Sequence, residues 1–398
     1  MALSEPAGIP FAMLLVFGSA KLLAEVFERL NQPGIVGEII AGVVIGPSVL
    51  GWISPDDFLG ALSQLGVMFL LFRVGLEVKS SELMKVGGTA MLVASAGVAV
   101  PFVLGWGILR IWGQPQIEAV FTGAAMVATS VGITAQVLAD KGLMAARASR
   151  IILAAAVIDD ILGLLVLAFV SSLARGQVNL PGLAMTVALA FGFTLIVVKW
   201  GTGTVRRLVP RMQERLRIGE AQFAISMCVL FALSLMAVWV GVAAIVGAFL
   251  AGMALSDTVG RRLRDLAHGV TELLVPFFLA GVGMHLRLDT LTNRSSLLLA
   301  IVILFAALAS KLIGCGLGAY ALGMADAIRV GVGMMPRGEV GLVVAQIGLS
   351  MGVIAPEIFG VVVFMAVATT LIAPPLLALA YRNVPASKAA ASDSFRLG

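Results

Sequence analysis

Residues suited to chemistry in water are scarce in this chain of 398 residues. Charged residues make up 12% of it and hydrophobic residues 60%, whereas a soluble protein has about 25% charged and 45 to 50% apolar residues. Only two cysteines and two histidines are present, and Cys228 and Cys315 lie far apart in apolar runs. These shortages exclude a water-soluble protein, a disulfide scaffold and a zinc enzyme. We therefore expect neither an enzyme nor a cofactor.

Long apolar runs fill the sequence instead. A bilayer core about 30 Å thick needs about 20 apolar residues per helix, and every backbone polar group must be bonded within the segment. Breaks at charges, prolines and glycines predict thirteen spans, near 9–27, 34–50, 58–78, 86–110, 117–139, 148–174, 180–199, 220–237, 239–255, 271–287, 295–322, 327–351 and 354–381. The fold class expected is an all-α membrane protein, with a single transmembrane unit over 1–382 and a short cytoplasmic tail over 383–398.

Basic residues are divided unevenly between alternate loops. Of the 27 lysines and arginines, nineteen lie in one set of loops, four in the opposite set and four within the spans. Because cytoplasmic loops are enriched in Lys and Arg, the N-terminus is expected outside and the C-terminus in the cytoplasm. The basic stretch Lys199 to Arg217 fits this bias together with contact to anionic lipid. No nucleic-acid partner is expected.

An internal repeat runs through the sequence. Three segments match three later ones at offsets of 210, 208 and 209: Ile35–Gly42 with Ile245–Gly252, Leu65–Gly75 with Leu273–Gly283, and Val131–Gly132 with Val340–Gly341. Equivalent spans are seven apart, an odd number, so spans 1–6 and 8–13 would be inverted six-helix repeats joined by span 7. Inverted repeats built around interrupted helices are typical of secondary transporters.

Three ionisable residues lie midway along apolar runs. Asp159 and Asp160 are adjacent in the sixth span, and Lys311 is in the eleventh. A charge at the bilayer centre costs about 2.5 to 3.5 kcal/mol on insertion scales, so each is a functional candidate. Lys311 is the cation expected to compensate one carboxylate. Their contact is either a permanent ion pair or one that proton uptake makes and breaks, since burial disfavours a charged lysine.

Glycines, prolines and hydroxyl groups interrupt spans 5 and 12 at corresponding depths. Thr129 and Ser130 lie in span 5, and Arg337 and Glu339 follow Pro336 in span 12. Interrupted helices leave free carbonyls and opposed helix dipoles near the membrane centre. Carbonyl and hydroxyl oxygens with one carboxylate suit sodium. Arg337 and Glu339 either neutralise each other or the dipoles, or handle the ion directly.

Other charges in the spans suggest local roles. Lys21 and Glu25 are four residues apart on one helix and are expected to pair. Glu38 is close to the start of a span and is expected at the interface.

Taken together, four motifs resemble the bacterial monovalent cation:proton antiporter-2 family, NapA type. They are Val157–Asp160, Ala128–Thr134, Lys311 and Pro336–Leu342. The resemblance implies a homodimer of thirteen-span protomers that works by an elevator mechanism. A core domain, around 86–175 and 295–382, would contain two crossed, broken helices, spans 5 and 12. The remaining spans would form the dimerisation domain.

The resemblance also implies roles for single residues. Asp160 would bind sodium or a proton, with Thr129 and Ser130 beside it, and Asp159 would exchange a salt bridge with Lys311. Such antiporters are electrogenic and exchange one cytoplasmic sodium or lithium ion for two external protons. They serve pH homeostasis in the bacterial inner membrane.

Two alternatives remain open at this point. Potassium-exporting relatives carry Gln in place of the first aspartate, so Asp159 favours sodium over a potassium-selective antiporter. A bile-acid-type sodium symporter shares inverted repeats and crossed helices, but it would leave the two aspartates and Lys311 unexplained.

Overall fold

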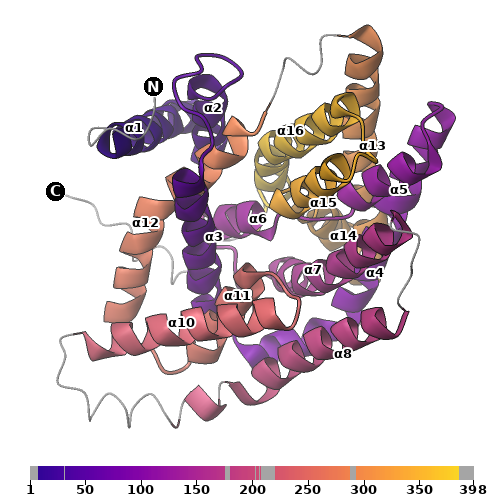
Figure 1. Ribbon diagram of the computed structural model, residues 1–398. Helices are drawn as coiled ribbons and strands as arrows, with labels where there is room; N and C mark the ends of the chain where they lie inside the picture. Colours follow the sequence, from indigo (N-terminus) through magenta and orange to yellow (C-terminus); the bar gives the residue numbers. More distant parts are fainter. Residues whose placement is uncertain are drawn as a thin grey trace.

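The chain folds into helices, and no strand occurs among the residues that the structure describes (Figure 1). The structure is a computed structural model that describes residues 8–30, 32–174, 180–201, 203–205, 207, 220–286 and 293–384. Its first half contains α1 (Gly8–Arg29), α2 (Gly34–Ile45), α3 (Asp57–Glu77), α4 (Ser80–Ile111), α5 (Gln116–Ala125), α6 (Val131–Asp140) and α7 (Arg147–Ala174).

The second half has a similar order of helices. After α8 (Leu180–Ile196) and a π-helical turn (Val197–Gly201) come α10 (Ala221–Trp239), α11 (Ala244–Leu255), α12 (Arg261–Met284), α13 (Arg294–Gly318), a short 3-10 turn (Tyr320–Leu322), α14 (Met324–Gly333), α15 (Glu339–Ser350) and α16 (Pro356–Ala380). Two predicted runs, 117–139 and 327–351, are each divided into two helices.

Many of these helices suit a membrane. Among the described residues, seven segments are long and apolar enough to cross one: Gly8–Arg29, Asp57–Glu77, Lys85–Ile111, Ala221–Trp239, Arg261–Met284, Arg294–Gly318 and Pro356–Ala380. Shorter apolar helices include α2, α6 and α11. Large apolar side chains such as Ile111 and Trp239 are exposed, as expected of a surface that faces lipid. The protein is therefore a multi-pass membrane protein.

The helices form two groups, which lie on opposite sides of the view in Figure 1. In the first group, called the scaffold helices, α3 packs against α11 and α12, and α2 packs against α1 and α12, while α10 covers α11. In the second, called the core helices, α4 packs against α5, α7 and α13, and α16 packs against α13, α14 and α15. Helix α6 belongs to the core helices and contacts α3 of the scaffold.

Glycines let the scaffold helices cross with their backbones in contact. At the crossing of α2 and α12, a Cβ atom at Gly42 or Gly283 would overlap the carbonyl oxygen of the other helix. At the crossing of α3 and α11, Gly75 and Gly252 meet in the same way. Gly42 and Gly252 are related by the offset of 210, and Gly75 and Gly283 by that of 208. The matching sequences therefore make matching helix contacts.

Candidate functional site

The two interrupted helices of the core touch at their breaks. The backbone N–H of Ser130, just before α6, donates a hydrogen bond to the carbonyl oxygen of Pro336 at 2.7 Å. The Thr134 hydroxyl donates to the Gly333 carbonyl, which ends α14, at 2.6 Å. A Cβ atom at Gly338 would come within 2.5 Å of Ser130. Four helix ends therefore meet at one place inside the core.

Arg337 fills the space between these helix ends. Its side chain is fully buried, and its guanidinium group donates to the carbonyl oxygens of Val127 at 3.2 Å and Ala307 at 3.0 Å. Val127 follows the end of α5, where unpaired carbonyl groups carry partial negative charge. The backbone N–H of Arg337 donates to the Thr369 hydroxyl on α16. Arg337 thus compensates the end of α5, while the side chain of Glu339 lies outside the described part of the structure.

Asp159 and Lys311 form a buried ion pair between α7 and α13. The Lys311 ammonium donates to Asp159 Oδ1 at 3.0 Å, and neither side chain is exposed to solvent. Asp159 Oδ2 is also buried and has no hydrogen-bond partner among the described residues. An under-satisfied buried carboxylate is costly. The ion pair thus uses one oxygen of the Asp159 carboxylate and leaves the other without a described hydrogen bond.

Asp160, the neighbour of Asp159, faces a different part of the protein. It is 5% exposed and lines a cavity of about 10 Å³, which is close to the smallest space that admits a water molecule. The other lining residues are apolar and come from core and scaffold helices: Leu71, Val131, Leu153, Val157, Ile245, Val246 and Phe249. Asp160 thus lies where the core meets the scaffold, behind an apolar barrier.

The first turn of α6 reaches the same cavity through Val131. The two residues before it are Thr129, which is buried, and Ser130, which is half-buried. The Thr129 hydroxyl has no hydrogen-bond partner among the described residues. The N-terminal end of a helix carries partial positive charge, and this end of α6 lies beside the cavity that Asp160 lines. The structure brings Asp160 and the α6 N-terminus to one cavity, and it pairs Asp159 with Lys311.

A larger cavity opens beside the crossing, between the two groups of helices. Its volume is about 650 Å³. Scaffold residues that include Pro47, Ser63 and His285 line one side of it, and Arg337 and Gln346 lie on the core side. Ser54 and Pro55 of the α2–α3 loop also line this cavity, so it lies at the end of the molecule that holds that loop.

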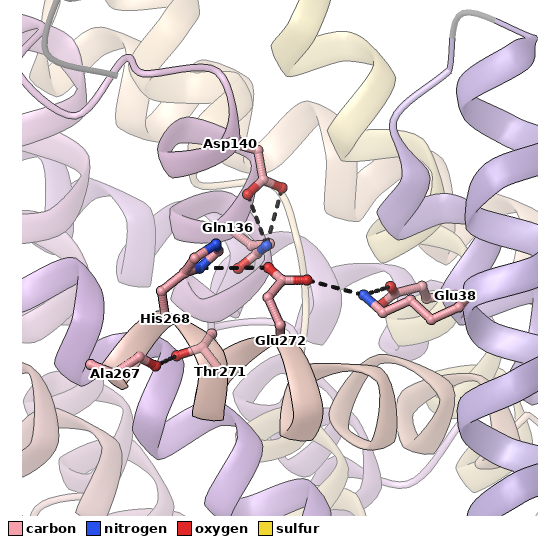
Figure 2. A network of polar contacts seen from close by, with 8 residues as sticks. Glu38, Gln136, Asp140, Ala267, His268, Thr271 and Glu272 are labelled. Atoms are coloured by element: carbon pink, nitrogen blue, oxygen red, sulfur yellow. Dashed lines mark hydrogen bonds and ion pairs between the residues drawn. The ribbon is translucent and has the colours of Figure 1, made fainter. Parts of the chain in front are cut away.

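A second polar cluster links the scaffold helices (Figure 2). Lys21 on α1 bonds to Glu38 on α2 at 3.1 Å and to Glu272 on α12 at 3.3 Å. One turn earlier on α12, His268 lies 3.8 Å from Glu272. Glu38 is 6% exposed and lies near the start of α2, so its carboxylate is buried among the helices, and its place at the membrane interface stays a prediction. The cluster ties α1 to the rest of the scaffold.

The predicted pairing of Lys21 with Glu25 is wrong. Glu25 bonds instead to Arg29 on α1, at 2.8 Å. Lys21 bonds instead to the carboxylates of Glu38 and Glu272, because tertiary packing brings α2 and α12 next to this part of α1. Figure 2 also shows Gln136, which donates a hydrogen bond to Asp140 within α6 at 2.9 Å.

Sequence reasoning missed another buried acid, Glu118 in the first turn of α5. It is 4% exposed, and its carboxylate accepts a hydrogen bond from the backbone N–H of Ala355 at 2.7 Å, just before α16 begins. The residue that follows, Pro356, has no N–H of its own to bond. Glu118 therefore fixes the first half of the interrupted helix to α16.

Comparison with known proteins identifies the family. The profile described as "Sodium/hydrogen exchanger, transmembrane" matches residues 13–380. The chain belongs to this family. This chain is 36% identical to the Na(+)/H(+)-K(+) antiporter GerN of Bacillus cereus, over 92% of its own length and 95% of that protein. It is 33% identical to the high-affinity Na(+)/H(+) antiporter NhaS3 of Synechocystis, over 96% and 92%.

The fold of this chain also resembles that of a solved structure. The sodium proton antiporter MjNhaP1 from Methanocaldococcus jannaschii superposes with a TM-score of 0.67, covering 94% of this chain and 96% of that one. At 16% sequence identity this likeness concerns the fold alone. The family match favours the sodium/hydrogen exchanger family over the hypothesis of a bile-acid-type sodium symporter.

Proposed function

We propose that the protein is an electrogenic antiporter that exchanges cytoplasmic sodium or lithium for external protons. The observation that carries this proposal is the pair of adjacent buried carboxylates, one held by Lys311 and the other facing a cavity at the core–scaffold boundary. Competition between sodium and a proton for Asp160 couples the two flows. A proton-loaded or sodium-loaded carboxylate can cross the apolar barrier, whereas a bare anion is too costly to carry.

The net charges of the proton-loaded and sodium-loaded states differ, and this difference makes the exchange electrogenic. In the proton-loaded state, Asp160 is neutral and the Asp159–Lys311 pair has no net charge. In the sodium-loaded state, sodium lies between two ionised aspartates and Lys311 has released its proton, which leaves one negative charge. Two protons then enter for each sodium ion that leaves, and one net charge crosses the membrane.

The proposed architecture has thirteen spans. Helices α5 and α6 together form one interrupted span, and α14 and α15 together form another. Spans 1–6 and 8–13 form inverted repeats around α8, and the matched glycine contacts support this arrangement. The N-terminus lies outside and the C-terminus in the cytoplasm of a bacterial inner membrane. On this orientation the cavity of about 650 Å³ opens to the outside.

Transport is proposed to occur by an elevator movement. The core domain around residues 86–175 and 295–382 carries Asp160, and the remaining spans form a dimerisation domain that holds two protomers together. The part of the core–scaffold contact that closes over Asp160 is apolar, including Leu71, Val246 and Phe249. Apolar surfaces allow sliding because no strong polar contact has to be broken. Anionic lipid is proposed to contact the basic cytoplasmic loops.

A second candidate function is exchange of potassium, because the relative GerN is a Na(+)/H(+)-K(+) antiporter. We expect sodium and lithium, but not potassium or rubidium, to drive proton flux in proteoliposomes that contain the purified protein. Asp159 supports this expectation, because potassium-exporting relatives carry Gln at the corresponding position. The panel is run at several pH values, with Asp160→Asn as the inactive control. Flux with potassium equal to that with sodium would replace the sodium assignment by the second candidate.

A further inference from the structure

Gly97, midway along α4, faces the buried ion pair. A Cβ atom at this position would lie 2.6 Å from the Cys315 sulfur, 3.4 Å from Lys311 Nζ and 3.8 Å from Asp159 Oδ1. Real Cβ atoms do not approach other heavy atoms to 2.6 Å, so an alanine requires a neighbour to move. Because Gly97 has no side chain, Cys315 and the ion pair can occupy the space beside it.

The surrounding packing prevents an easy adjustment. Helices α4 and α13 approach with their backbones in contact: a Cβ atom at Gly314 would lie 2.8 Å from the Ala96 carbonyl oxygen, and one at Gly318 would lie 2.7 Å from Val93 Cα. Small residues four apart allow such close packing of membrane helices. Cys315 and Lys311 are fully buried on the same helix. A group added at Gly97 therefore pushes on the helix that carries Lys311.

We infer that Gly97 is a positioning residue for transport, because it allows α13 to hold Lys311 Nζ at bonding distance from Asp159. This inference rests on the proposed function, in which the Asp159–Lys311 contact is made and broken during the cycle. The effect of Gly97 is transmitted through Cys315, whose sulfur is the atom closest to the missing Cβ. Removal of that sulfur should consequently make room for a methyl group at Gly97.

The chain offers a matched control on the same helix. A Cβ atom at Gly107 would have no neighbour within 4 Å. Gly97→Ala and Gly107→Ala both replace a glycine in α4 and should gain the same helix propensity. They differ in the contact with Cys315 and Lys311. The set is completed by Cys315→Ala and the double variant Gly97→Ala with Cys315→Ala.

The test measures sodium-dependent proton flux in proteoliposomes across a pH series and at several imposed membrane potentials. We expect Gly97→Ala to slow transport about tenfold, as overpacking of a closed site does. We also expect its pH profile to shift and its dependence on potential to weaken, because the proton affinity of the ion pair has changed. Gly107→Ala and Cys315→Ala should behave like the wild type. The double variant should recover both the rate and the pH profile.

Two results would overturn the inference. One is a wild-type pH profile and potential dependence in Gly97→Ala, whatever its rate, since a loss of folded protein alters only the amplitude. The other is a double variant that remains as impaired as Gly97→Ala. If Gly97→Ala gives no folded protein, Cys315→Val decides, because its larger side chain presses on the same space and should produce the same shifts. Absence of sodium-dependent flux in the wild type would instead reject the proposed function.

Discussion

Replacing Asp160 with asparagine is expected to reduce sodium-dependent proton flux in proteoliposomes to the level of protein-free vesicles. Asparagine has nearly the same shape as aspartate but neither releases a proton nor offers an anionic oxygen to sodium. Asp160 is the carboxylate that lines the closed cavity between core and scaffold. Without a titratable group there, sodium and protons no longer compete, and the coupling between their flows is lost.

A binding measurement separates this loss from misfolding. A ligand present at 100 times its dissociation constant stabilises a protein by about 2.7 kcal/mol. Sodium should therefore raise the melting temperature of the wild type but not that of Asp160→Asn. The variant itself should remain folded without sodium, because the neutral amide has nearly the same shape as the carboxylate and costs less to bury than a charge. Asp257→Asn, at an exposed position, is the control and should keep both flux and stabilisation. Sodium-dependent flux in Asp160→Asn would contradict the assignment.

The second large effect is expected for Lys311→Gln, which should convert electrogenic exchange into electroneutral exchange. In the wild type the lysine releases a proton when sodium binds, which adds one charge to each cycle. Without the lysine, Asp159 stays protonated, and one proton at Asp160 exchanges for one sodium ion. Sodium-dependent proton flux should persist at a reduced rate, and the transport current should vanish.

The stability of this variant depends on the same protonation. Breaking a buried ion pair costs about 3 to 5 kcal/mol when the remaining charge is left uncompensated. Proton uptake by Asp159 should lower that cost, so Lys311→Gln should be more stable at low pH than at high pH. Asp159→Asn combined with Lys311→Gln removes the titrating group and should abolish this pH dependence. A transport current of wild-type size in Lys311→Gln would show that the lysine does not carry the second proton.

Much of the candidate site can be predicted from the sequence because charge in an apolar span is costly. That cost singles out Asp159 and Lys311, which the structure joins in one ion pair. The internal repeat is also informative. The breaks between α5 and α6 and between α14 and α15 lie at residues that correspond by the offset of 208. Their roles in transport remain predictions.

The sequence is less informative where a partner comes from a distant segment. Local spacing assigned Glu25 to Lys21, but the tertiary structure places Glu38 and Glu272 there. Gly97 gives no signal at all, because it is one of 45 glycines and its importance depends on what α13 brings against it. Spacing along one helix thus predicts contacts only where no other helix competes for them.

The potential at which sodium-coupled flux stops tests the central claim most directly. Purified wild-type protein is placed in proteoliposomes with a tenfold sodium gradient and equal pH on both sides, and the membrane potential is varied. Exchange of two protons for one sodium ion moves one charge, so the flux should reverse at a potential of about 59 mV, which balances a tenfold gradient. Flux that never reverses, whatever the potential, would contradict electrogenic exchange through the Asp159–Lys311 pair.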